Sequence, residues 1–409
     1  MKTVLFLIED GPYRCDHRVR REAASLRSQG LSVLVVAPVE NDGLLEETLD
    51  GGVEIFGFRR SSNGRGLGGL LSEYASSLLQ IGARVAQLHK SRGFDVIHAS
   101  NPPDLLWLVA APYVALGKPF VFDMHDPVPE IFEERFRDSP ARVLMPLVKL
   151  AEQASVRLAS RVVVANGGLR RIAVERCGKA EGLVSVVGNG PDLTRFGAVT
   201  PSEEVRGLGD KVVGYLGNMN PQDGLDHFVE MMRIIRQDRG RADVGFLLVG
   251  TGSSFEETQA SIERQGLSEN TWMTGRLEAD AFLPLLSGVD LCVQPDPPTD
   301  LNHLLTMTKT MEYMALGKPV VAYPLWETRR VFEGVCRLAR NETPDGLADA
   351  VLDLLDDPQA MSELGLRGRS LVESRLCWAH RESTLLKVYR DLLPGTIMQP
   401  SVEADCTSA

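Results

Sequence analysis

Short apolar runs alternate with longer amphipathic stretches along this chain, and this alternation restricts the possible folds more than any other feature. Continuous apolar runs, typical of strands buried on both faces, occupy residues 4–8, 32–37, 53–57, 96–99, 120–122 and 162–165. Helical spacing of apolar residues follows at 17–29, 70–90 and 103–116, and Gly30 stands where the first helix should end. This rhythm predicts a parallel sheet with right-handed crossovers and helices on both faces.

The same rhythm restarts in the second half of the chain. Strand-like runs recur at 212–216, 244–249, 271–274, 290–294, 319–322 and 337–339, separated by helical stretches at 224–237, 254–265, 279–286, 308–315 and 343–355. We therefore predict two doubly wound, Rossmann-like α/β domains over residues 1–200 and 201–376. A helix at 377–393 should pack back towards the first domain, and 394–409 should form a disordered tail. Ligands of such sheets bind beyond the carboxyl ends of the strands, so we expect an active site in a central cleft that the two domains face.

Composition and charge exclude several classes of protein. A chain of 409 residues, 44% apolar and 24% charged, suits two soluble domains rather than a fibre or a disordered protein. The net charge of −11 argues against a nucleic-acid partner, and it resides in residues 191–409, which carry 21 Lys and Arg against 33 Asp and Glu. Six cysteines without a CxxC pair, and an initial apolar run too short for a signal peptide, predict a cytoplasmic protein, with the inner membrane surface as an alternative location.

The segment 306–322 carries the clearest chemistry. A helix that Thr306 or Thr308 could cap leads into a Gly-Lys-Pro turn and a buried strand. The start of a helix attracts phosphate, Lys309 adds a full positive charge there, and Glu312 follows on the same face, where its carboxylate could accept both hydroxyls of a ribose. From the pattern alone, a solvated Lys309–Glu312 pair on a surface helix is an equally good interpretation.

Four further segments, together with 306–322, occur in the order seen in one enzyme family. Residues 186–196, 214–224, 248–252 and 275–277 resemble, in turn, its NGVD-like element, its glycine-rich loop, its LVGxG element and the turn that reads the base. The chain thus resembles the retaining family 4 glycosyltransferases of the GT-B fold. The resemblance implies transfer of a sugar from a nucleotide diphosphate sugar, with UDP-sugars favoured, to an acceptor hydroxyl with retention of configuration. It also implies that no metal or other cofactor is needed.

The resemblance assigns donor-site roles to residues of the second half. Glu312 would bind the ribose, while Thr308 and Lys309 would bind the diphosphate and Lys309 would stabilise the leaving group. The remaining donor-site residues lie on loops that would face the phosphates or flank the base: Gly217, Asn218, Asp223, Gly250, Arg276 and Leu277. Two departures stand out. Leu304 replaces a glutamate that holds sugar hydroxyls in many members, with Asn302 or His303 as possible substitutes, and the loop 218–223 has no cation.

In the first half, His125 follows a buried strand and resembles the family's histidine at the edge of the cleft, so we assign it a catalytic, positioning role. Residues with comparable places near strand ends are acceptor-side candidates: Asp16, Arg18, His98, Asn101 and Glu130. A core role is the alternative for His98. Turn or helix capping is the alternative for Asn101 and Glu130.

The sequence leaves the acceptor open among small molecules, glycans and lipid-linked sugars, and does not set the oligomeric state. The stretches 67–92 and 135–161 combine cations with apolar residues and could make weak peripheral contact with a membrane, although ordinary sheet-covering helices also explain them. Two other functions compete with transfer. One is a nucleotide-sugar epimerase or hydrolase on the same fold, and the other is a catalytically silent protein that binds a nucleotide sugar.

Overall fold

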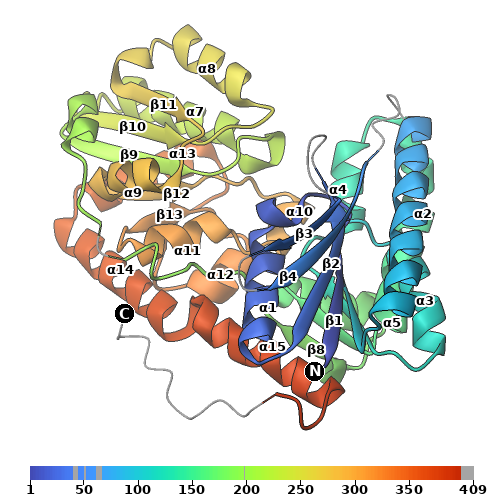
Figure 1. The fold of residues 1–409 in the computed structure, drawn as a ribbon. Coiled ribbons are helices and arrows are strands. Elements are labelled where there is room, and N and C mark those ends of the chain that lie inside the picture. The colour runs from blue at the N-terminus through green and yellow to red at the C-terminus, as the bar shows by residue number, and fades with distance from the viewer. Residues whose placement is uncertain (40–44, 50–51, 61–66, 198, 398–409) are drawn as a thin grey trace. The chain divides into compact units, whose positions relative to one another are not determined.

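The computed structural model describes residues 1–39, 45–49, 52–60, 67–197 and 199–397. They form two compact units (Figure 1). Unit 1 comprises Met1–Gly188 together with the chain from Arg381, and unit 2 comprises Asn189–His380. The chain thus passes into unit 2 before the predicted boundary at residue 200. The predicted tail lies mostly outside the described residues.

Unit 1 is built on one eight-stranded sheet in the order β3-β4-β2-β1-β5-β6-β7-β8. Seven strands are parallel: β1 (Thr3–Leu7), β2 (Ser32–Pro38), β4 (Val53–Phe58), β5 (Val96–Ser100), β6 (Phe120–Met124), β7 (Arg161–Val164) and β8 (Val184–Val186). The edge strand β3 (Glu46–Leu49) pairs antiparallel with β4. Sequence periodicity missed β3, which is polar, and β8, which has only three residues.

Helices cover both faces of this sheet (Figure 1). On one face lie α2 (Leu67–Ser91), α3 (Trp107–Ala115) and α5 (Met145–Leu158), and on the other lie α1 (His17–Ser28) and the returning helix α15 (Trp378–Leu392). The short helices α4 (Val128–Arg135) and α6 (Gly167–Arg171) follow β6 and β7. The first helix ends as predicted, because Gly30 adopts a φ of 80°. Tyr389 of α15 is fully buried, so this helix contributes to the core of unit 1.

Unit 2 holds a six-stranded parallel sheet in the order β11-β10-β9-β12-β13-β14. Its strands are β9 (Lys211–Leu216), β10 (Val244–Val249), β11 (Thr271–Gly275), β12 (Leu291–Gln294), β13 (Val320–Ala322) and β14 (Arg337–Leu338), which confirms all six predicted runs. One core cluster packs the sheet against α7 (Leu225–Arg233), α8 (Phe255–Arg264) and α13 (Pro344–Leu355). A second packs its other face against α9 (Ala279–Gly288) and α11 (Thr308–Ala315). Two more helices are α10 (Asp300–Leu304) and α12 (Trp326–Phe332), and α14 (Pro358–Leu371) follows α13.

Among the helices that the structure describes, none combines the length and the apolar character needed to cross a membrane. The stretch around α5 does expose three apolar side chains, Val143, Leu147 and Leu150. Peripheral contact with a membrane stays a prediction.

Candidate functional site

In unit 2, the loops after β9, β10 and β11 pack backbone against backbone beyond the carboxyl ends of the strands. Gly217 N donates to Val249 O at 3.1 Å, and Gly250 N donates to Gly275 O at 3.0 Å. A Cβ on Gly250 would lie 1.9 Å from Gly217 O, so only glycine allows this approach. The loops therefore present main-chain atoms at the edge where ligands of parallel sheets bind.

Lys309, in the first turn of α11, lies beside this edge. Its ammonium is 2.9 Å from Asp296 Oδ1 and 3.3 Å from Asp223 Oδ1, and it lies over the ring of Tyr215 at 5.0 Å. Burial by itself would lower the pKa of Lys309, but Asp296, Tyr215 and Asp223 raise it above its ordinary value. Two carboxylates share one buried ammonium, so Lys309 does not supply an unopposed positive charge.

The other residues of α11 have different surroundings. Thr308 is exposed, at the first position of the helix. The prediction that Thr306 or Thr308 caps this helix is wrong: the cap is Met307, and Thr306 Oγ1 donates instead to Glu327 Oε2 at 2.8 Å. The amides of the first turn thus lack a side-chain cap. Glu312 lies one turn further along and is half-buried.

The remaining predicted donor residues lie on the same loops. Asn218 is exposed, and its main-chain oxygen accepts a hydrogen bond from the Tyr215 hydroxyl. Arg276 is exposed directly after Gly275, and Leu277 packs against the core of unit 2. The structure therefore gathers Gly217, Asn218, Asp223, Gly250 and Lys309 at one edge, and the 275–277 turn joins it through the Gly250–Gly275 hydrogen bond.

The two suggested substitutes for the missing glutamate have structural partners. The amide of Asn302 donates to Gln222 O and Pro297 O, both at 2.9 Å, and the side chain is buried. His303 Nδ1 accepts from Trp326 N at 3.1 Å. Asn302 thus braces the 220–224 loop, and its burial makes it a poor replacement for a carboxylate that binds sugar.

Sequence reasoning missed Asp296 and Tyr215. Asp296 comes two residues after β12, so the rule that selects residues just past strand ends could have found it. Tyr215 is a core residue of β9, and no local signal separates it from other strand residues. Burial raises the pKa of both groups.

In unit 1, His125 follows β6 directly and its side chain is 15% exposed. Its Nδ1 lies 3.6 Å from Asp123 Oδ2, and its Nε2 lies 3.9 Å from Asp126 Oδ2. Burial by itself would lower the pKa of His125, but the two carboxylates raise it to about 9. At neutral pH the imidazole is therefore a cation with two N–H donors.

Four of the five acceptor-side candidates are tied into buried or half-buried polar networks. His98 is fully buried, and its Nδ1 forms a hydrogen bond with the hydroxyl of Tyr389 at 2.6 Å. Asn101, three residues further along the chain, is also fully buried. Arg18 is buried against Asp123, and Glu130 pairs with Arg176. Burial of Arg18, His98 and Asn101 favours supporting roles over direct contact with an acceptor, whereas Glu130 is half-buried and its role as an acceptor-side residue stays a prediction. Asp16 is half-buried and caps α1 by accepting from Val19 N.

The fully buried trio Glu22, His98 and Asp123 has the composition of a metal-binding set. The guanidinium of Arg18 lies against two of its three members, 2.6 Å from Asp123 Oδ1 and 3.3 Å from Glu22 Oε1. The carboxylates are thus matched by an organic cation, which makes the trio a poor site for a metal ion.

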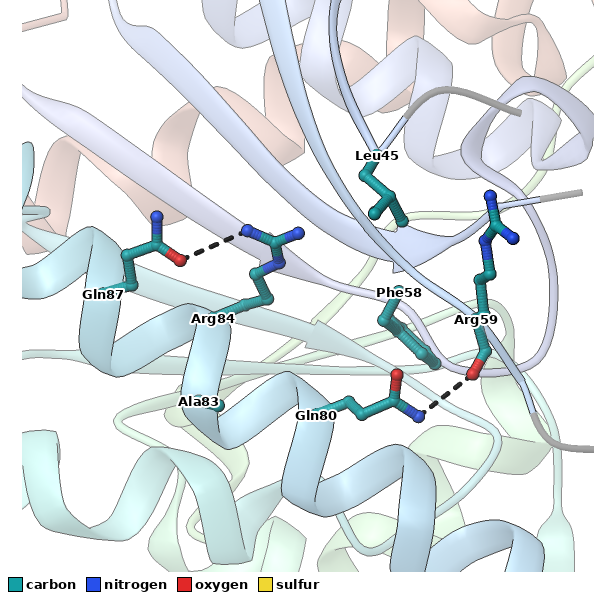
Figure 2. Close-up of a pocket in the computed structure, with 8 residues that line it drawn as sticks. Leu45, Phe58, Arg59, Gln80, Ala83, Arg84 and Gln87 are labelled. Atoms are coloured by element: carbon teal, nitrogen blue, oxygen red, sulfur yellow. Dashed lines mark hydrogen bonds between the residues drawn. The ribbon is translucent and has the colours of Figure 1, made fainter. Parts of the chain in front are cut away.

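Unit 1 also contains a pocket of about 340 Å³ between the end of β4 and α2. Figure 2 shows its polar lining. Gln80 Nε2 donates to Arg59 O at 3.0 Å and Arg84 Nη1 donates to Gln87 Oε1 at 3.2 Å. Its walls are formed by Leu45, Gly57, Phe58, Arg59, Gln80, Ala83, Arg84 and Gln87, none of which was a predicted site residue.

Two Rossmann-like units with such glycine-rich loops define the GT-B architecture, and solved structures agree. A sucrose-phosphate synthase from Thermosynechococcus elongatus aligns with a TM-score of 0.76 at 17% identity, over 96% of this chain and 99% of that one. Anabaena HepE in complex with UDP and glucose aligns with a TM-score of 0.67 at 18% identity, over 96% of this chain and all of that one. At sequence identities of 17% and 18%, the similarity to these structures shows the fold alone.

The chain belongs to the group 1 glycosyltransferases. A family model described as Glycosyltransferase Family 4 matches residues 17–195, and one described as Glycosyl transferases group 1 matches residues 210–357. The chain is 25% identical to 2-deoxystreptamine glucosyltransferase from Streptomyces kanamyceticus, over 73% of this chain and 78% of that protein. It is 28% identical to 2-deoxystreptamine N-acetyl-D-glucosaminyltransferase from Streptomyces fradiae, over 63% of this chain and 61% of that protein. The protein is thus a glycosyltransferase.

Proposed function

We propose that this glycosyltransferase moves a hexose from a UDP-sugar to a hydroxyl of a small polar acceptor, with retention of configuration and without a metal ion. The observation that carries the proposal is the edge of unit 2 at which glycines allow the loops to pack closely. There the amides in the first turn of α11, which have no side-chain cap, lie near the 217–220 and 250–252 loops. Main-chain N–H groups at a helix start suit a diphosphate, and Glu312 on the same helix suits a ribose.

The proposed chemistry needs no protein nucleophile. The bond between the sugar C1 and the diphosphate oxygen breaks while the acceptor oxygen bonds to C1 on the same face. The acceptor proton passes to the departing phosphate. Amides of α11 stabilise the charge that develops on the leaving group, and His125, as an imidazolium, donates a hydrogen bond to a substrate oxygen.

The names of related proteins support the substrate classes. The HepE structures contain UDP with glucose and UDP-glucose, which favours uridine over other bases. Two curated relatives are named for 2-deoxystreptamine, a small polyhydroxylated amine, which favours a small polar acceptor. A mannosyltransferase of Corynebacterium glutamicum is named as GDP-mannose-dependent, so GDP-mannose is the competing donor to test.

A donor panel followed by product analysis tests the proposal. In thermal unfolding with UDP-, GDP-, ADP- and dTDP-sugars, we expect the UDP-sugars to raise the unfolding temperature most. Incubation with 2-deoxystreptamine should then give a glycoside whose anomeric configuration, read by NMR, matches the donor. Glu312→Gln should weaken UDP-sugar binding at least tenfold, whereas Glu363→Gln, a matched change on the exposed face of α14, should not. Stabilisation by none of the donors, or equal binding by both variants, would refute the assigned site.

A further inference from the structure

His125 is held by its main chain as well as by its ring. The side-chain Oδ1 of Asn101 accepts from His125 N at 2.8 Å and from Asp126 N at 3.2 Å. The amide of the same side chain donates to Asp126 O at 2.7 Å and to Asp104 Oδ1 at 3.0 Å. One fully buried amide thus fixes both peptides that carry the histidine, and its flat geometry leaves the loop little freedom to rotate.

The ring of His125 faces a carboxylate that is itself clamped. Arg18 reaches Asp123 through two parallel hydrogen bonds, Nε to Oδ2 at 2.7 Å and Nη2 to Oδ1 at 2.6 Å. Its third nitrogen donates to Val187 O at 2.7 Å. Such a two-pronged pair fixes the carboxylate plane, and hence the direction in which Oδ2 points at His125.

The charge and burial of the surrounding groups determine which carboxylate acts on His125. Burial by itself would raise the pKa of Asp123, but Arg18 holds it well below its ordinary value, so the carboxylate stays ionised. Burial instead raises the pKa of the neighbouring Glu22 to about 7. The charged groups that act on His125 are Asp123, Asp126, Arg18 and Asp10. Of these, Asp123 is the fully buried one, and it acts on the imidazole most strongly.

We propose that Asn101, Asp123 and Arg18 are positioning residues for His125. Asn101 fixes the main chain, Asp123 orients the imidazole and keeps it charged, and Arg18 acts through Asp123 by keeping that carboxylate ionised and aligned. The Nε2–H is thereby directed away from Asp123. Its nitrogen lies 3.9 Å from Asp126 Oδ2, which is longer than a hydrogen bond, so it can donate to a substrate oxygen. This inference rests on the proposed function for the kinetic role of His125, but the geometry of the network does not depend on it.

NMR titration of the histidine side chains tests the positioning without any substrate. Histidine-labelled protein gives the His125 signal, which is assigned by its loss in His125→Asn. In the unaltered protein it should titrate near pH 9. In Asp123→Asn the midpoint should fall towards the ordinary value for histidine, because the carboxylate that favours the cation is gone. Arg18→Lys should lower the midpoint less, because the positive charge beside Asp123 remains while the bidentate geometry is lost.

Matched variants separate positioning from general damage. Arg176→Lys alters a comparable arginine of unit 1, which pairs with Glu130 and Glu152, and should leave the His125 midpoint near 9. Asn101→Ala should lower kcat of sugar transfer roughly 10- to 100-fold with a smaller change in KM. Asn166→Ala, which removes a buried helix cap of α6 in the same unit, should leave kcat unchanged.

The outcomes separate failure of this inference from failure of the proposed function. A midpoint that stays near 9 in both Asp123→Asn and Arg18→Lys, or that moves equally in Arg176→Lys, overturns the positioning roles. Full transfer activity in His125→Asn instead overturns the kinetic role of His125 and leaves the titration result standing. If Asp123→Asn does not fold because Arg18 is left without its partner, Arg18→Lys, which keeps both charges, decides the question.

Discussion

Each unit places a cationic side chain among carboxylates just past the ends of its parallel strands, but the two units balance the charge differently. In unit 1, Asp123 is shared by two cations, Arg18 and His125. In unit 2, one cation, Lys309, is shared by two carboxylates, Asp223 and Asp296. The imidazolium of His125, whose side chain is 15% exposed, can therefore donate to a ligand, whereas the ammonium of Lys309 is already enclosed by two carboxylates.

This difference changes the interpretation of the lysine that the sequence singled out. A lysine in the first turn of a helix suggests a direct partner for phosphate, and the net negative charge of the second half of the chain makes such a cation more important for binding an anion. In the structure the side chain of Lys309 is 9% exposed, and its ammonium is bound to Asp223 and Asp296. Its structural effect is to hold the 217–224 loop and the residues after β12 together, so main-chain amides carry more of the proposed phosphate binding.

Removing the cation of unit 2 should have the largest effect. Lys309→Met leaves Asp296, which is 1% exposed, beside Asp223 without a compensating charge, and should lower the free energy of unfolding of unit 2 by about 3–5 kcal/mol. Urea unfolding followed by fluorescence of Trp272 and Trp326 measures it. Lys318→Met is the control, because that ammonium binds the carbonyls of Ser287 and Val289 rather than acids. A loss no larger than that of the control would contradict the charge-sharing account.

Raising the pH should titrate the cation of unit 1 before that of unit 2. The pKa of His125 is raised to about 9, so the imidazolium is present at neutral pH and is lost as the pH rises through 9. Its contribution to stability is complete below the ordinary histidine value and disappears over the same rise. We expect kcat to fall about tenfold per pH unit above about 9, measured as sugar transfer between pH 6.5 and 10. A profile whose loss begins near 6.5 would contradict this assignment.

Removing one carboxylate from the Lys309 cluster should make its ratio of cations to carboxylates more like that of the His125 cluster. Asp296→Asn leaves Lys309 paired with Asp223 alone, so the edge loses one negative charge. Binding of UDP should tighten roughly fivefold, or by about 1 kcal/mol, because an anion no longer meets a second buried carboxylate. Calorimetric titration measures the change, and Asp243→Asn, which removes a carboxylate paired with Arg241, is the control. Weaker binding in Asp296→Asn would show that the acid orients Lys309 for the ligand.

Metal removal should have the smallest effect. In unit 1 the Arg18 guanidinium pairs with both acids of the one metal-like trio among the described residues, and in unit 2 the Lys309 ammonium pairs with Asp223 and Asp296. We expect transfer activity to stay within about twofold after dialysis against EDTA, relative to protein resupplied with Mg²⁺ or Mn²⁺. Loss of activity that a divalent cation restores would refute the proposed metal independence.

Local sequence predicted most of the fold and part of the site. Buried parallel strands such as β1 and β10 need continuous apolar runs, so all six runs of unit 2 and six of the strands of unit 1 were visible. The polar edge strand β3 carries no such signal. His125 and Lys309 were visible because charged residues just past a strand or at a helix start are conspicuous against an apolar background.

Asp123 and Asp126 neighbour His125 in the sequence, but the more distant partners were not visible, because contacts between distant segments leave no local pattern. Arg18 and Asp123 are separated by 105 residues, and His98 and Tyr389 by 291. Asn101 directly follows β5, as a ligand-binding residue would, whereas His98 lies within β5 and Arg18 in the first turn of α1. Only burial in the structure distinguishes a supporting side chain from a contacting one.

The sequence by itself determined the two α/β units, the family and the positions of the two cations, because those depend on apolar periodicity and on short motifs. Only the tertiary structure decided what each cation does. The parallel sheets bring Asp123 beside His125 with Arg18 behind it, and bring Asp296 and Asp223 onto Lys309. The charge a ligand meets is the sum over such neighbours, and that sum is fixed by packing rather than by any one residue.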